Sequence, residues 1–254
     1  MTLSVDGQSG VGDTRSPARP SRRPTEPERP KRAWWMGVLW FLVGSFLLVF
    51  VLPVYLTLDP SKAHIKLDPT VPVHYPLLLL HVATGTISMV TGALQMWPWL
   101  RVKHPAWHRW SGRVYVYAVF LGAPSLAALV VIRARVAGVE DSQNILGFGL
   151  AGIVWLWTTA AGLKTGRERR WVEHRRMMIY SYAIAFSITG SRFFFVIAWG
   201  IPGFDSRWIN DNAGWFFWVV NLLIAQWWLN RTQKRPLQIA RSSRPAAKAL
   251  EEVP

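Results

Sequence analysis

Six histidines are the side chains of this sequence best suited to ligand or proton chemistry, because the chain contains no cysteine. Without cysteine the chain forms no disulfide, carries no thiolate nucleophile and ligates no iron–sulfur cluster. Two of the histidines, His108 and His174, each begin a His-Arg pair beside a long apolar block. Two imidazoles at one membrane depth on different helices are what axial ligation of a b-type haem requires. This pair is therefore the first candidate for a cofactor site, with haem iron as the metal.

Four arginines accompany the two histidines in the sequence: Arg109, Arg113, Arg175 and Arg176. A guanidinium makes forked hydrogen bonds to carboxylates, which suits it to the propionates of haem. The alternative is that the histidines and arginines form a basic surface that contacts only lipid phosphates. Both interpretations place an anionic group beside His108, His174 and these arginines.

Two further polar residues, His81 and Arg192, lie inside apolar blocks, where an ionisable side chain seldom faces lipid. His81 begins a stripe on one helical face that continues with Gly85, Ser88 and Gly92. Small residues at this spacing favour close helix packing, and a planar cofactor is the alternative occupant of the groove. Arg192 has no Asp or Glu within any apolar block to pair with. It either extends to the membrane surface or contacts an anion that comes from outside.

Six apolar blocks must position these residues: Trp34–Leu56, Tyr75–Trp99, Val114–Ile132, Ile145–Leu163, Met177–Trp199 and Ala213–Asn230. Blocks of roughly 20 apolar residues match the hydrocarbon core of a bilayer, whereas soluble helices alternate apolar with polar residues. Tryptophans near many block ends are typical of the membrane interface. The sequence therefore predicts an all-α integral membrane bundle of six transmembrane helices.

The distribution of positive charge predicts the orientation. Of the 29 Lys and Arg residues, 23 fall in the two tails and in segments 100–113 and 164–176, and five fall on the other side. The positive-inside rule then places both termini in the cytoplasm. Three regions follow: a disordered basic tail (1–33), a transmembrane domain (34–230) and a basic cytoplasmic tail (231–254). Charge at these places favours anionic lipids at the cytoplasmic face as partners, and not nucleic acid.

A shorter pattern suggests an internal repeat of two hairpins. The His-Arg pair at His108 is followed by a Tyr-x-Tyr-Ala run from Tyr115, and the pair at His174 by another from Tyr180. Duplication of one hairpin and a chance match both explain the pattern.

A family resemblance rests on three elements: His81 followed by Gly85, the run His108-Arg109-x-x-Gly112-Arg113, and the run His174-Arg175-Arg176-Met177-Met178. Over roughly residues 75–200 the chain resembles the bacterial predicted membrane proteins of the domain-of-unknown-function 2306 family. The resemblance implies a multi-pass protein of the bacterial plasma (inner) membrane without an established activity. A more distant likeness, in histidine placement alone, is to b561-type membrane cytochromes, which hold haem between histidines on neighbouring helices.

Three functions stay open at this point. The first is a small haem b redox protein with a membrane or electron-transfer partner, and the second is a non-redox carrier that uses His81 and Arg192 to bind an anion. The third is a subunit that only packs against other membrane proteins. Cation-coupled transport is disfavoured because the blocks contain no carboxylate. The sequence has no phosphate-binding glycine loop and no nucleophile elbow. Whether the chain is an enzyme is left open.

Overall fold

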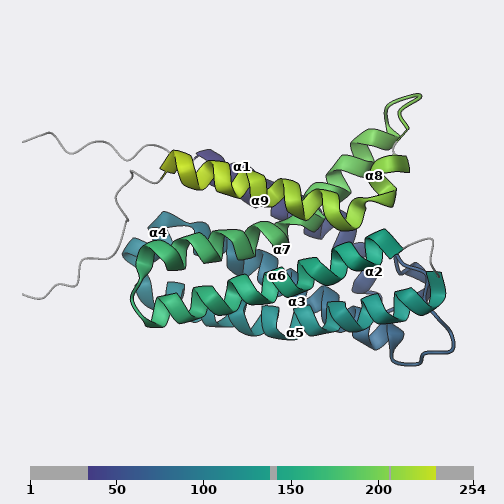
Figure 1. Cartoon of the computed structure of the whole chain (residues 1–254), viewed down its shortest axis with the longest axis horizontal. Coiled ribbons are helices and arrows are strands. Elements are labelled where there is room, and N and C mark those ends of the chain that lie inside the picture. Colours follow the sequence, from purple (N-terminus) through teal and green to yellow (C-terminus); the bar gives the residue numbers. More distant parts are fainter. Residues whose placement is uncertain (1–33, 138–141, 206, 233–254) are drawn as a thin grey trace, which may run out of the picture. The chain divides into compact units, whose positions relative to one another are not determined.

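The computed structural model describes residues 34–137, 142–205 and 207–232, and in this part the regular elements are all helices (Figure 1). Five helical segments are long and apolar enough to cross a membrane: Trp34–Tyr55, His74–Met96, Pro105–Arg135, Ser142–Arg167 and Trp171–Trp199. The predicted all-α fold is confirmed for the described residues, with five helical segments that could cross a membrane. The two predicted tails, residues 1–33 and nearly all of 231–254, lie outside the described residues.

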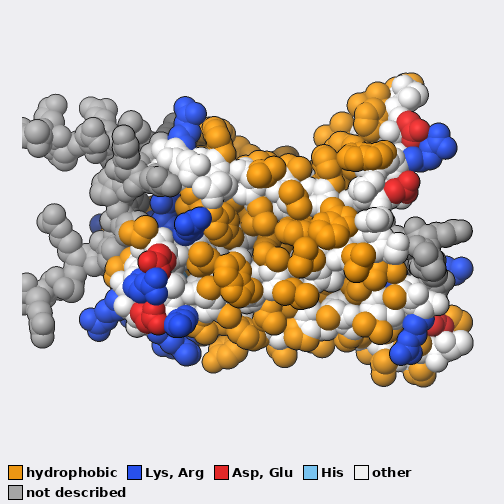
Figure 2. Space-filling view, viewed as in Figure 1, with side chains coloured by type: hydrophobic (Ala, Val, Ile, Leu, Met, Phe, Trp, Pro, Cys, Tyr) orange, Lys and Arg blue, Asp and Glu red, His pale blue; other side chains and the backbone are white. Residues whose placement is uncertain are grey.

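Four helices form the bundle that positions the candidate site: α3 (His74–Met96), α5 (Pro105–Ala137), α6 (Ser142–Arg167) and α7 (Trp171–Trp199). Helix α5 packs on α3 and α6, and α7 packs on α6 and α3, so α5 and α7 face each other diagonally. The first helix, α1 (Trp34–Phe46), contacts α3 and α7, and α9 (Ala213–Thr232) covers α6 and α7. Hydrophobic side chains cover most of the visible surface between the charged helix ends (Figure 2), as a bilayer requires.

The remaining elements are short, and they shape the connections. They are the π turn η1 (Leu47–Val51), α2 (Leu52–Tyr55), η2 (Pro60–Lys62), α4 (Pro98–Lys103) and α8 (Arg207–Asp211). The π turn ends two residues before Pro53, whose ring would collide with the carbonyl four residues earlier in a regular α-helix. A wider turn relieves this collision, so the first membrane segment continues as helix to Tyr55.

Helices α5 and α7 extend well beyond the apolar blocks that predicted them. Helix α5 begins nine residues before Val114, and α7 begins six residues before Met177. The basic segments 100–113 and 164–176, which separate apolar blocks in the sequence, are therefore largely helical. His108 and His174 each lie in the first turn of a helix. Hydropathy detects only the part of a helix inside the hydrocarbon, whereas backbone hydrogen bonding continues into the interface.

Helix α9 has 20 residues but is not among the five apolar segments. Its polar side chains turn toward α7: Asn221 Nδ2 donates to the carbonyl oxygen of Ala183 at 3.1 Å, and the Tyr180 hydroxyl donates to Gln226. These contacts satisfy polar groups that would be costly against lipid. The low hydropathy of α9 thus reflects its contacts with protein.

Buried hydroxyl groups join three helices inside the bundle. The Tyr115 hydroxyl of α5 lies 2.7 Å from Ser181 Oγ of α7, and Thr159 Oγ1 of α6 lies 2.6 Å from the same Ser181 oxygen. Trp155 Nε1 donates to the Tyr115 oxygen at 3.5 Å. Each of these buried polar groups therefore has a partner, which fixes how α5, α6 and α7 meet.

The small-residue stripe of α3 serves helix packing at Gly92. A Cβ atom there would overlap the ring of Tyr182 and would lie 3.1 Å from Cε2 of Tyr115. At Gly85 no neighbouring atom lies within 4 Å of the same position. Tyrosine rings therefore occupy the part of the groove at Gly92 that a planar cofactor would need.

Candidate functional site

Two histidines and two arginines gather at one end of the bundle. His108 interacts electrostatically with Arg101 of α4, with His174 of α7 and with its neighbour Arg109. Arg101 in turn interacts with Arg175 of α7. We call His108, His174, Arg101 and Arg175 the His/Arg cluster. The structure thus brings together the two histidines that the sequence singles out.

The connection between α6 and α7 places His174. The amide of Arg170 donates to the carbonyl oxygen of Thr165 at 2.9 Å, and the amide of Arg169 donates to that of Gly166 at 3.2 Å. With Arg169 at φ 60°, this is a Schellman motif, which ends α6 and reverses the chain within three residues. The first turn of α7 therefore packs against the last turns of α6.

His174 is held in one orientation by α6. Its Nδ1 lies 2.7 Å from the carbonyl oxygen of Gly162, so Nδ1 carries the proton and donates it. A Cβ atom at Gly166 would lie 2.8 Å from the same nitrogen, so the imidazole rests where α6 has no side chain. Histidines that ligate metals are commonly oriented by this kind of Nδ1–H bond to a carbonyl. Nε2 of His174 is left with a free lone pair.

His108 is held by the end of α3. Gln95 Nε2 donates to the carbonyl oxygen of His108 at 2.7 Å and to Ser111 Oγ at 2.6 Å. The Nδ1 atom of His108 is buried, and it has no hydrogen-bond partner among the described residues. A buried nitrogen without a partner is uncommon because its desolvation is not compensated. His108 therefore presents a nitrogen that a bound group can satisfy.

Arg101 and Arg175 supply positive charge beside the histidines. Burial lowers the pKa of Arg101, and the nearby charge of Arg175 lowers it further. Arg175 Nη2 donates to Thr232 Oγ1 at 2.8 Å, which ties the cluster to α9. Two guanidinium groups beside two imidazoles make this end of the bundle positively charged, and guanidinium groups bind anions well.

The other predicted arginines lie at the surface. Arg109 and Arg113 are exposed on α5, and Arg176 turns back to its own helix, where its Nε donates to the Tyr180 hydroxyl at 3.1 Å. Sequence reasoning does not single out Arg101. It belongs to a short helix bounded by Pro98 and Pro105, and no spacing rule distinguishes it from other basic interfacial residues.

His81 and Arg192 contact different parts of the protein. His81 Nδ1 lies 3.2 Å from the carbonyl oxygen of Gly122 and 3.3 Å from Ser125 Oγ, both on α5. The electrostatic neighbour of Arg192 is Tyr55, at the end of the first membrane segment. His81 therefore bridges α3 and α5, and its contacts give no support to an anion site that it shares with Arg192.

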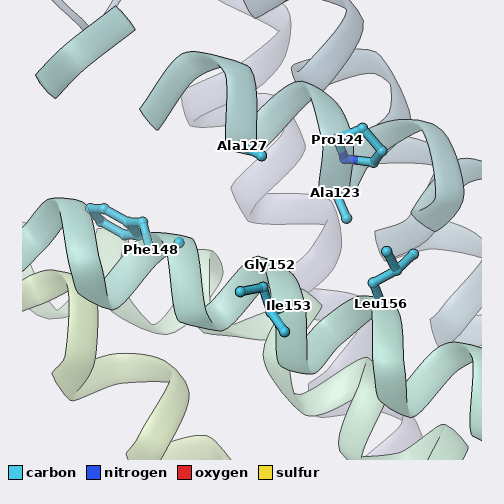
Figure 3. Close-up of a pocket in the computed structure, with 8 residues that line it drawn as sticks. Ala123, Pro124, Ala127, Phe148, Gly152, Ile153 and Leu156 are labelled. Atoms are coloured by element: carbon cyan, nitrogen blue, oxygen red, sulfur yellow. The ribbon is translucent and has the colours of Figure 1, made fainter. Parts of the chain in front are cut away.

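A pocket between α5 and α6 has no polar side chain in its lining (Figure 3). Its lining is entirely apolar: Ala123, Pro124, Ala127, Phe148, Gly149, Gly152, Ile153 and Leu156. These side chains offer no ligand, acid, base or hydrogen-bond donor.

The His/Arg cluster contains residue types that b-type haem sites use, namely imidazoles and guanidinium groups. In the described part of the chain, no group of three or more His, Asp and Glu side chains is placed to hold a metal ion. A haem iron needs fewer ligands from the protein, because the porphyrin supplies four nitrogens and a b-type protein adds two histidines. The cluster has two imidazoles, those of His108 and His174, which lie close enough to interact electrostatically. Arg101 and Arg175 add two guanidinium groups, the kind of side chain that pairs with carboxylates.

Comparison with known proteins identifies a family of membrane proteins. A family model described as "Predicted membrane protein (DUF2306)" matches residues 78–229. No curated protein and no solved structure shows a significant match. The matched region begins in α3 and ends in α9, so it contains all four residues of the His/Arg cluster.

Proposed function

This chain belongs to the DUF2306 family of predicted membrane proteins, and we propose that it is a small redox protein that binds one haem b in the His/Arg cluster. The orientation of His174 carries the proposal. Its Nδ1–H is fixed on Gly162, so that Nε2 is available to iron, as in histidines that serve as metal ligands. The second ligand is His108, from the diagonally placed helix α5.

The surrounding residues would set the boundaries of the haem site. Tyr115 and Ser181 each lie seven residues deeper than His108 and His174, about 10 Å along the helices at 1.5 Å per residue. Their hydrogen bond joins α5 to α7 below the histidines. Arg101 and Arg175 would pair with the propionates. The haem would supply reversible one-electron transfer, and a membrane or soluble electron-transfer partner follows from that chemistry.

The amount of haem in purified protein tests this proposal. Protein purified in mild detergent from haem-replete cells is expected to contain close to one haem b per chain in a pyridine haemochrome assay. A value near zero, in protein whose circular dichroism shows intact helices, would contradict haem binding.

Colourless protein would favour a second candidate function, the binding of an anionic lipid or small anion without iron. The observation behind it is that Arg101 and Arg175 are close enough to interact, with two imidazoles beside them. Such a cluster attracts phosphate or carboxylate whether or not a metal is present. In this case the protein is a non-redox carrier or lipid-binding protein.

We further propose six membrane crossings, with both termini in the cytoplasm of a bacterial cell and the domain in its plasma membrane. Helix α9 supports the sixth crossing, since 20 residues span about 30 Å and its polar residues contact α7. The excess of Lys and Arg around the His/Arg cluster supports the orientation.

Reporter fusions test this topology. An enzyme that is active only outside the cytoplasm is expected to be active when fused after Leu67 or Phe204. The same reporter should be inactive after Lys103 or Arg169, because those positions lie on the side rich in Lys and Arg. Activity at Lys103 or Arg169 would overturn the orientation.

A further inference from the structure

The loop between Tyr55, the last residue of α2, and His74, the first residue of α3, is joined to both helices through histidine side chains. In the first half of the loop, the ring of His64 meets the ring of Tyr55 edge to face, with 6.2 Å between the ring centroids. In the second half, the amide of Asp68 donates to Nδ1 of His74 at 2.9 Å. Both contacts therefore depend on an imidazole, the side chain whose charge ordinarily changes near neutral pH.

The hydrogen bond at His74 defines the protonation state of its imidazole. A backbone amide can only donate, so Nδ1 of His74 offers a lone pair, and the single N–H of the neutral ring is on Nε2. The side chain is only 3% exposed, so Nδ1 depends on the Asp68 amide, and not on water, for its hydrogen bond. A protonated imidazole carries hydrogen on both nitrogens and accepts no bond. Protonation of His74 therefore breaks this contact and sets two N–H groups against each other.

The charged groups around this contact keep their charge while histidine titrates. Asp68 Oδ1 accepts hydrogen bonds from the hydroxyl and amide of Thr70, at 2.7 and 2.9 Å, and these bonds hold the pKa of the Asp68 carboxyl below its usual range. Arg135, in the last turn of α5, interacts with the same carboxylate and stays protonated. The carboxylate also interacts electrostatically with His74, so it offers the protonated ring a partner once the amide bond is lost.

We propose that His74 is a pH-sensitive switch for the loop 56–73. With a neutral imidazole the loop is docked on the first turn of α3, and with a protonated imidazole the segment around Asp68 is released. This end of the bundle is remote from the His/Arg cluster, because Gln95, which contacts His108, lies 21 residues beyond His74, about 30 Å along α3. The switch therefore goes beyond the proposed haem function and does not depend on it. It responds to the pH on its own side of the membrane.

A nitroxide spin label on the loop tests this switch. The chain contains no cysteine, so a single introduced cysteine is the only labelling site. Lys66→Cys places the label at an exposed position two residues before Asp68. In the detergent-purified full chain, the ratio of immobile to mobile label is expected to fall about tenfold or more from about pH 8 to about pH 5, because the docked loop loses a buried hydrogen bond. The helical circular dichroism should be the same at both pH values.

His74→Asn, added to the labelled protein, is the deciding variant, because the oxygen of an asparagine side chain accepts the Asp68 amide and does not titrate. Its label should stay immobile at both pH values. His64→Asn is the matched control: it removes the other histidine of the loop and should keep the full pH response. If His74→Asn fails to fold, His74→Gln takes its place. The proposal is overturned if the label with His74 intact shows no change with pH, if the folded His74 variant keeps the response, or if His64→Asn loses it.

Discussion

Replacement of Gly92 by leucine is expected to prevent most of the protein from folding, whereas leucine at Gly85 should be tolerated. Both glycines lie on the same face of α3, seven residues apart. At Gly92 even a Cβ atom overlaps the Tyr182 ring, which is enclosed between helices, while at Gly85 nothing lies within 4 Å. Overpacking typically costs about 1–3 kcal/mol, and leucine here exceeds a methyl group by three carbons.

Size-exclusion chromatography of fluorescent fusions in detergent measures this difference. The Gly92→Leu protein should lose most of its monodisperse peak, and the Gly85→Leu protein should keep it. Gly92→Ala should fall between them, with a lower Tm than wild type. Equal behaviour of the two leucine variants would mean that α3 and α7 do not meet at Gly92 as described.

His108→Ala and His174→Ala are each expected to remove most of the haem, because loss of one axial ligand leaves a single weak attachment in a bis-histidine site. The matched control is His104→Ala. His104 lies only four residues from His108, but its ring packs on Trp99 at 4.6 Å and it is not part of the His/Arg cluster. The measurement is Soret absorbance per mole of protein for the three variants.

Helical content from circular dichroism must accompany these spectra, so that loss of haem is not confused with unfolding. Full Soret absorbance in the folded His174→Ala protein would exclude His174 as a ligand. Equal loss in all three variants would point to general destabilisation and would not identify a ligand.

Much of the fold is predictable because membrane insertion depends on long apolar blocks, which are visible in sequence. The first residues of α5 and α7 are not predictable in this way, because both helices begin in basic segments whose low hydropathy does not indicate a membrane helix. Helix α9 shows the opposite difficulty. Its Asn221 and Gln226 reduce its apolarity, and their contacts with α7 become visible only in three dimensions.

The tyrosine pattern shows where sequence similarity misleads. Matching the two Tyr-x-Tyr-Ala runs pairs Tyr117 with Tyr182, but Tyr117 is 68% exposed and Tyr182 only 7%. Matching the His-Arg pairs instead aligns Tyr115 with Ser181, and these two side chains hydrogen-bond at 2.7 Å. A shift of one residue rotates a side chain by about 100° on a helix, so the register decides which residues face each other.

The sequence predicts three members of the candidate site, His108, His174 and Arg175, but not Arg101. His108 and His174 share a position relative to the apolar blocks, and this position alone predicts that they lie at one membrane depth. Arg101 joins them because α4 lies beside α5. The Schellman motif that precedes His174 has an arginine, Arg169, at the left-handed position where a glycine is usual, so the sequence does not predict it. Turn geometry of this kind depends on tertiary packing that spacing rules do not describe.

Near-infrared magnetic circular dichroism of the purified, oxidised protein is the decisive measurement of haem ligation, because the position of its charge-transfer band identifies both axial ligands of a low-spin haem. The expected result is a six-coordinate haem b with two imidazole ligands, lost in either His108→Ala or His174→Ala. A five-coordinate or high-spin haem, a ligand pair other than two imidazoles, or folded protein without any haem signal would contradict bis-histidine ligation by the His/Arg cluster.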